Sequence, residues 1–152
     1  MCEHCGCRGV KPIADLMDEH FELLELAGDV RRHVAAGDRG AAATVLAELG
    51  LHLDRHVRRE ETGVFAALKS QGDFADAVAE LEQEHISFDA QLASLDVAAD
   101  EFDVRVDRLL DELSEHIDKE NLGIFPVAVV TLGAVGWEIV TAAHARLTPA
   151  KG

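Results

Sequence analysis

Histidine and glutamate recur at matched spacing in two parts of this chain. His56 stands four residues before Glu60, and His116 stands four residues before Glu120. Residues four apart lie one turn apart on the same face of a helix, so each pair of side chains can reach one site together. Imidazole nitrogen suits first-row transition metals, and carboxylate oxygen can bridge two of them. The spacing therefore predicts a metal site.

The residues around these pairs repeat as well. Residues 56–65 and 116–125 share His, Glu, Gly, an aliphatic residue and Phe in the same register. Leu, Glu and His recur in the same way at residues 16–20 and 81–85. The pattern indicates an internal duplication of a helical hairpin. A pseudo-twofold axis between the two copies would bring six candidate ligands to the centre: His20, His56, Glu60, His85, His116 and Glu120.

Helical periodicity of apolar residues runs through the chain, without the alternation typical of strands. Four long helices with short turns between them predict an all-α fold, an up-down-up-down antiparallel four-helix bundle with a short extra C-terminal helix. We expect Asp73 to cap the third helix and Pro126 to kink or end the fourth. The expected helices are 12–36, 39–69, 73–95, one from Glu101 to Pro126, and 127–147, the last packing through Trp137, Ile139 and Val140.

Domain organisation and charge follow from composition. We expect a Cys-rich tail (1–11), one helical domain (12–148) and a short tail (149–152). Against 14 Lys and Arg stand 29 Asp and Glu, for a net charge of −15. Such a surface repels phosphate backbones and anionic lipid, so neither nucleic acid nor membrane is an expected partner. Residues 1–11 lack a signal-peptide apolar stretch, which favours a cytoplasmic protein.

Three cysteines, Cys2, Cys5 and Cys7, gather around His4 at the N-terminus. An odd, clustered set is not a disulfide framework. One interpretation is a flexible, reducible tail. The others are a second metal site, or thiols that deliver electrons or metal to the centre.

The two His-x-x-x-Glu segments, together with the Glu-His pairs at 19–20 and 84–85, resemble the hemerythrin-like HHE cation-binding family over residues 12 to 130. The resemblance implies a hemerythrin-like bundle around two iron ions, a non-haem di-iron centre with an oxo or hydroxo bridge. It also implies chemistry with dioxygen, peroxide or nitric oxide. Carried over to this chain, the terminal nitrogen ligands would be His20, His56, His85 and His116, and the bridging ligands would be Glu60 and Glu120.

The chain departs from the oxygen-carrying members of that family. Those usually have two histidines four apart on the third helix, whereas here Asp89 follows His85 at that distance. The missing ligand position could be filled by Asp89, by water or by His52. Open coordination favours turnover over reversible carriage. We expect His33 to be solvated at a helix end and His144 to be structural.

Several functions fit this pattern. The first is a di-iron protein that turns over O2, peroxide or NO, either as a peroxidase or catalase or as an NO-reducing oxidoreductase. The second is a module that senses or stores O2 or iron without turnover. A third is nitric-oxide defence or iron–sulfur repair, and a metal-free bundle is the least favoured because it would leave buried polar groups unsatisfied. The sequence leaves open whether the chain is an enzyme, and whether it is a monomer or a homodimer.

Overall fold

The computed structural model describes residues 10–72 and 74–147, and this part of the chain folds into helices without strands. The all-α prediction is therefore confirmed. The elements in chain order are α1 (Lys11–Ala35), α2 (Arg39–Thr62), α3 (Val64–Gln71), α4 (Ala75–Ser94), α5 (Phe102–Lys119), the π-helix η2 (Glu120–Ile124), α6 (Phe125–Thr131) and α7 (Ala134–Leu147).

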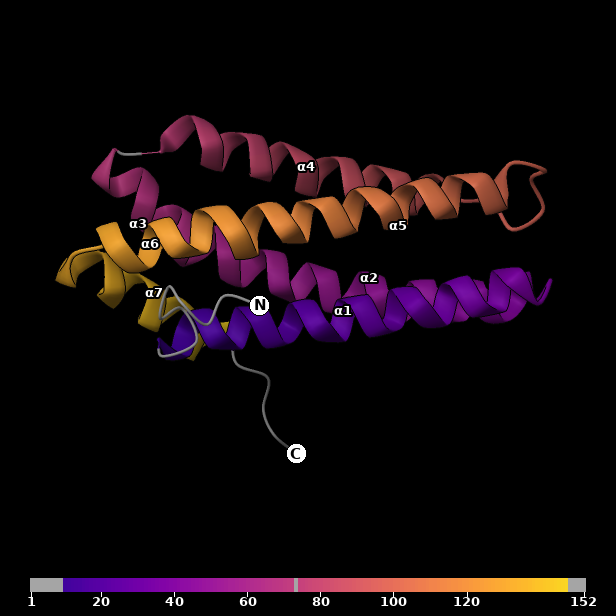
Figure 1. Ribbon diagram of the computed structural model, residues 1–152, viewed down its shortest axis with the longest axis horizontal. Helices are drawn as coiled ribbons and strands as arrows, with labels where there is room; N and C mark the ends of the chain where they lie inside the picture. Colours follow the sequence, from indigo (N-terminus) through magenta and orange to yellow (C-terminus); the bar gives the residue numbers. More distant parts are fainter. Residues whose placement is uncertain (1–9, 73, 148–152) are drawn as a thin grey trace.

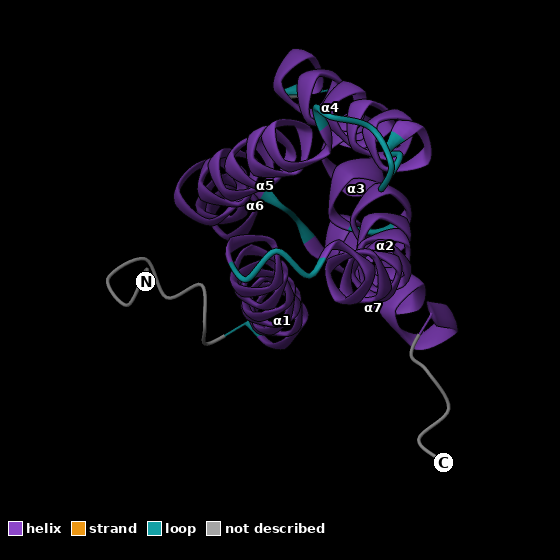
Figure 2. Ribbon diagram, turned by 90° about the vertical axis from the view of Figure 1, so that its right-hand side faces the viewer, coloured by secondary structure: helices purple, strands orange, loops and turns teal. Residues whose placement is uncertain are grey.

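Four long helices, α1, α2, α4 and α5, run along the length of the molecule (Figure 1). Helix α1 contacts α2 and α5, and α4 also contacts both of them. Seen from the end, the four helices therefore surround a common interior (Figure 2). The α1–α2 turn and the α4–α5 loop lie at one end, whereas α3, α6 and α7 lie at the other (Figure 1).

The helix ends follow from local chemistry. Pro12 lies in the first turn of α1, where a missing N–H leaves no hydrogen bond unmade. Asp38 caps α2, because its carboxylate accepts a hydrogen bond from the Ala41 N–H at 3.0 Å. Gly72 ends α3 at a φ of 81°, a conformation that favours glycine. The expected cap Asp73 lies outside the described residues, and α4 begins after Phe74.

Two helices predicted as continuous are interrupted just after a candidate ligand. The helix predicted over 39–69 divides at Gly63 into α2 and α3. In the other half, the irregularity comes before Pro126, in the π turn where the Phe125 N–H bonds to the Glu120 carbonyl oxygen. Pro126 itself does not end the helix, because it sits in the first turn of α6, which continues to Thr131.

The apolar core has two parts with a polar layer between them. Along α1, His20 lies between Leu16 of one part and Leu23 of the other. Along α4, His85 lies between Leu81 and Phe88 in the same way. The structure thus places buried histidines at one level of the bundle.

Helix α7 covers the end of the molecule that contains α3. It contacts α3, α2 and α1, with Val140 fully buried and both Trp137 and Ile139 packed against the core. This is the packing expected of the C-terminal segment. Among the described helices, none has both the length and the apolarity needed to cross a membrane.

Candidate metal centre

All six residues singled out by their spacing converge in the interior. They form two overlapping groups whose candidate ligand atoms lie within 4.8 Å of one another. One group contains His20 and His56, here called pair 1, and the other contains His85 and His116, here called pair 2. Both groups share Glu60 and Glu120, and all six side chains are buried.

Each of the two glutamates turns one oxygen towards each histidine pair. Glu60 Oε2 lies 3.2 Å from His56 Nε2, and Glu60 Oε1 lies 3.3 Å from His85 Nε2. Glu120 Oε1 lies 2.8 Å from His20 Nε2, and Glu120 Oε2 lies 3.1 Å from His116 Nε2. Each pair of imidazoles therefore faces one oxygen of each carboxylate. Such a set offers two cations two nitrogens and two oxygens apiece, with both carboxylates as bridges.

The outward nitrogen of each of the four histidines of the centre contacts an oxygen at 2.8 Å. His56 Nδ1 meets Glu19, and His116 Nδ1 meets Glu84. The remaining two contacts are His85 Nδ1 with Glu61 and His20 Nδ1 with Asn121. An oxygen acceptor there holds the proton on Nδ1, which leaves the Nε2 lone pair directed inward for a metal.

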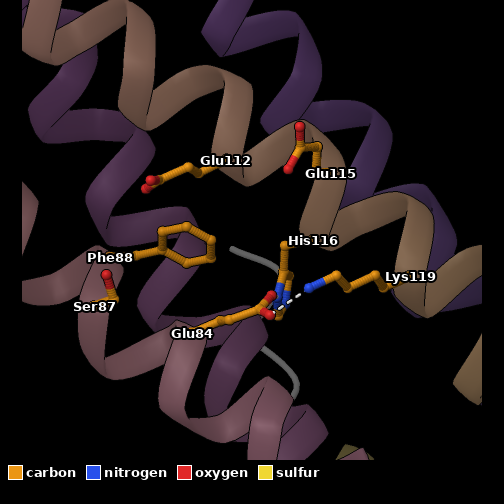
Figure 3. Close-up of a pocket in the computed structure, with 7 residues that line it drawn as sticks. All are labelled: Glu84, Ser87, Phe88, Glu112, Glu115, His116 and Lys119. Carbon is orange, nitrogen blue, oxygen red and sulfur yellow. Dashed lines mark hydrogen bonds and ion pairs between the residues drawn. The ribbon is translucent and has the colours of Figure 1, made fainter.

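Two of these acceptors are in turn held by cations. Arg59 forms an ion pair with Glu19, and Lys119 Nζ lies 2.6 Å from Glu84. Figure 3 shows Glu84 of α4 between His116 and Lys119 of α5. The cation–carboxylate–imidazole chain therefore occurs once in each half and fixes the ring orientation of His56 and His116.

The interior carboxylates of Glu60 and Glu120 shift the pKa values of the buried histidines. Burial lowers the pKa of His85, but the carboxylates of Glu120 and Glu60 outweigh burial and raise it to about 10. Burial likewise lowers the pKa of His56, and Glu60, Glu120 and Glu19 raise it well above its usual range. Burial raises the pKa of Glu120, yet the four histidines around its carboxylate bring it well below its usual range. The centre therefore favours positive charge strongly.

Aromatic rings pack against three of the histidines. Phe125 stacks on His20 with ring centroids 5.5 Å apart, and Phe65 stacks on His85 at 5.8 Å. Phe88 meets His116 edge-on. The phenylalanine that the two repeated segments share thus has one role in both halves, packing on a histidine of the other half and closing the centre to water.

The interior atoms fit a metal better than they fit one another. His56 Nε2, both Glu60 carboxylate oxygens and Glu120 Oε2 make no hydrogen bond to any described residue. Moreover, His85 Nε2 and His116 Nε2 lie 3.1 Å apart, where two lone pairs would repel each other unless a cation or a proton lay between them. Buried polar atoms are rarely left in such a state. A cation between each histidine pair and the glutamates would satisfy all of them.

Comparison with known families agrees with this geometry. The model of the hemerythrin family, described as the hemerythrin HHE cation binding domain, matches residues 11–128. The chain belongs to the hemerythrin family. No curated protein and no solved structure matches it.

Two small surface pockets of this hemerythrin-family protein reach the histidines from opposite halves. A pocket of about 230 Å³ lies over His116 between α4 and α5 (Figure 3). A pocket of about 190 Å³ lies over His56 between α1 and α2. Apart from Phe88, their lining positions correspond in the duplication, and Glu84 and Lys119 in one pocket take the places of Glu19 and Arg59 in the other. Both pockets approach the centre from the Nδ1 side of a histidine.

The proposed substitutes for the missing family ligand lie away from the centre. Asp89 is exposed, and His52 is directed towards Glu22 and Glu48 rather than inward. Neither residue joins the two groups of candidate ligands found among the described residues. Within the described part of the chain, each candidate metal position thus has two imidazole nitrogens and two carboxylate oxygens around it.

The other histidines and the cysteines stand apart from the site. His33 is partly exposed in the last turn of α1, as expected. His144 is buried on α7, and burial and Arg59 lower its pKa. The predictions for the cysteine tail fall on residues 1–9, which lie outside the described residues.

Sequence reasoning missed the four acceptors that orient the histidines: Glu19, Glu61, Glu84 and Asn121. Their signal was present, because each directly precedes or follows a candidate ligand and each keeps the register of the duplication. The sequence did not show which histidine each acceptor contacts. Glu19 serves the histidine of the next helix and not its own neighbour His20, and this depends on how the helices face each other.

Proposed function

We propose that this chain holds two iron ions as a non-haem di-iron centre inside a hemerythrin-like up-down-up-down four-helix bundle, and that the centre reacts with dioxygen, peroxide or nitric oxide. One observation carries the proposal. Glu60 and Glu120 each present one oxygen to pair 1 and the other to pair 2, which is the arrangement of two bridging carboxylates. The terminal ligands in this proposal are His20, His56, His85 and His116.

The donor set narrows the metals that such a site could hold. The described ligands are imidazole nitrogen and carboxylate oxygen without thiolate, and this mixture suits iron or manganese. Four protein ligands for each metal leave coordination positions open for a small molecule. Iron in this centre would supply electrons to a small oxidant bound at such a position.

The residues around the centre have separable roles in this proposal. Glu19, Glu61, Glu84 and Asn121 hold the imidazoles in the ligating orientation. Phe65 and Phe125 exclude bulk water from the ligand side. The pockets over His56 and His116, of about 190 and 230 Å³, are large enough to take up a diatomic gas or peroxide near the centre. A cytoplasmic setting remains the expectation.

Metal content and the absorption spectrum test the proposal. Protein purified from iron-supplemented cells should contain two irons per chain, one for each histidine pair. It should also show a near-ultraviolet charge-transfer band that bleaches with dithionite and returns with peroxide. Bound zinc alone, without such a band, would overturn the di-iron assignment.

Two histidine variants form a test and its matched control. His116→Ala removes a candidate ligand and should lose iron and the band. His52→Ala removes a histidine that lies one turn from His56 but is directed outward, so it should keep both. If wild type and His116→Ala decompose peroxide at the same rate, the centre is not catalytic. A band that cycles with oxygen without consuming it would instead identify reversible binding.

A further inference from the structure

The two histidine pairs face the same two glutamates, but the acceptors that contact their Nδ1 atoms differ. In pair 2, both imidazoles donate from Nδ1 to carboxylates, His85 to Glu61 and His116 to Glu84. In pair 1, His56 donates to the carboxylate of Glu19, whereas His20 meets the neutral side-chain oxygen of Asn121. Asn121 takes the place in the second segment that Glu61 takes in the first. The duplication is thus broken at one acceptor.

This difference changes the strength of the ligands. A carboxylate that accepts from Nδ1–H makes the imidazole a stronger base at Nε2, and loss of such a partner typically lowers metal affinity by about 10- to 100-fold. An amide oxygen carries no full charge and provides a weaker hydrogen bond. Pair 2 has two strengthened imidazoles, and pair 1 has one. By this effect alone, a cation prefers the position between pair 2 and the glutamates.

Charge in the two flanking pockets acts in the same direction. The pocket over His116 is lined by Glu84, Glu112 and Glu115 against Lys119 alone. Arg108 lies 3.3 Å from Glu112 and offsets part of its charge.

The pocket over His56 has a different balance. There, Glu19 and Glu22 face Arg55 and Arg59, with His52 beside them. The acidic side chains are thus matched by arginines. The potential is therefore more negative on the pair 2 side, which attracts a divalent cation more strongly.

We propose that the two metal positions are unequal, and that the position at pair 2 binds a divalent cation first because Asn121 leaves pair 1 the weaker of the two. The inference rests on the proposed function, since it concerns the order in which that centre fills. In the wild-type protein we expect two binding steps that differ by about 10-fold or more in dissociation constant.

Titration of metal-free protein with Co²⁺, followed by calorimetry and by the visible cobalt bands, tests this order. Repulsion between two cations alone would also give two steps, so the decisive evidence comes from Asn121→Asp and Glu61→Gln. Asn121→Asp supplies the missing carboxylate to pair 1. It should tighten the second step by about 10-fold and change the first by about twofold at most. Glu61→Gln should weaken the first step by a similar factor and leave the second nearly unchanged.

Each outcome decides a different point. If Asn121→Asp tightens the first step instead, pair 2 does not fill before pair 1 and the inference is overturned, while the proposed two-metal centre stands. Two steps that neither variant alters would also overturn it. If the wild-type protein binds no Co²⁺ at all, both the inference and the proposed centre fail. Thermal unfolding of each variant checks that the bundle is intact, and Asn121→Asp decides the order even if Glu61→Gln unfolds.

Discussion

At the scale of single residues, a histidine in this interior can hold either a proton or a metal at Nε2, but not both. The carboxylates that raise the pKa of His85 to about 10 are the same groups that would bridge the metals. Metal binding must therefore displace protons, and metal affinity should rise with pH. The centre is thus a site at which protons compete with metal at neutral pH.

This competition predicts how the stability of metal-free protein depends on pH. The pKa of His85 is raised in the folded state from 6.5 to about 10, so protonated His85 stabilises the fold fully below pH 6.5. That stabilisation is lost as the pH rises from 6.5 towards 10. Urea unfolding of metal-free protein should therefore show a falling free energy of unfolding across this range. In His85→Gln, the fall should be smaller, and equal slopes in the two proteins would contradict the prediction.

The residues of the centre were predictable from the sequence to different degrees. Identity, spacing and register were enough to select the six side chains that the structure brings together. Their role as metal ligands stays a prediction. Periodicity alone does not fix side-chain direction, which is why the sequence also offered His52, one turn before His56, as a candidate ligand. In the structure it turns to Glu22 at the surface of the α1–α2 pair.

At the scale of elements, both candidate bridging ligands are followed by an irregular turn. Glu60 precedes the break at Gly63 by three residues, and Glu120 begins the π turn of η2. π turns inside α-helices are frequent at functional sites. The sequence showed Gly63 and Gly123 in matching positions, but not that one copy would become a break and the other a wide turn. The Gly63 copy packs closely against α7, whereas no described atom lies within 4 Å of a Cβ built at Gly123.

The two glycines therefore predict opposite responses to alanine. A Cβ at Gly63 would lie 2.6 Å from the Arg59 carbonyl oxygen and 3.4 Å from Ala143 Cβ on α7. Gly63→Ala should lower the free energy of unfolding by about 1–3 kcal/mol, the usual cost of overpacking. A Cβ at Gly123 meets no described atom within 4 Å, so Gly123→Ala should be neutral or stabilise by up to about 1 kcal/mol. Urea unfolding measures both, and equal effects would show that packing at Gly63 does not matter.

At the scale of the whole molecule, the centre joins parts of the chain that are distant in sequence. His20 on α1 meets Glu120 of η2 across a separation of 100 residues, and His85 on α4 meets Glu60 on α2. All four long helices or their extensions thus contribute to one buried cluster. An unfolded chain could not assemble these six ligands, so metal should bind the folded state almost exclusively. Binding of that kind is coupled directly to folding.

Metal removal should therefore destabilise the protein as a whole. Binding to the folded state alone stabilises it by about 2.7 kcal/mol per site when free metal is at 100 times its dissociation constant. Chelation should lower the midpoint of thermal unfolding, and added metal should restore it in proportion to the logarithm of its concentration. A variant with both Glu60→Gln and Glu120→Gln keeps the size of the side chains but removes the bridging charge, so its midpoint should not respond to metal. If the wild-type midpoint is also independent of metal, the buried histidines and glutamates do not bind it, and the polar layer of this bundle is held together by protons alone.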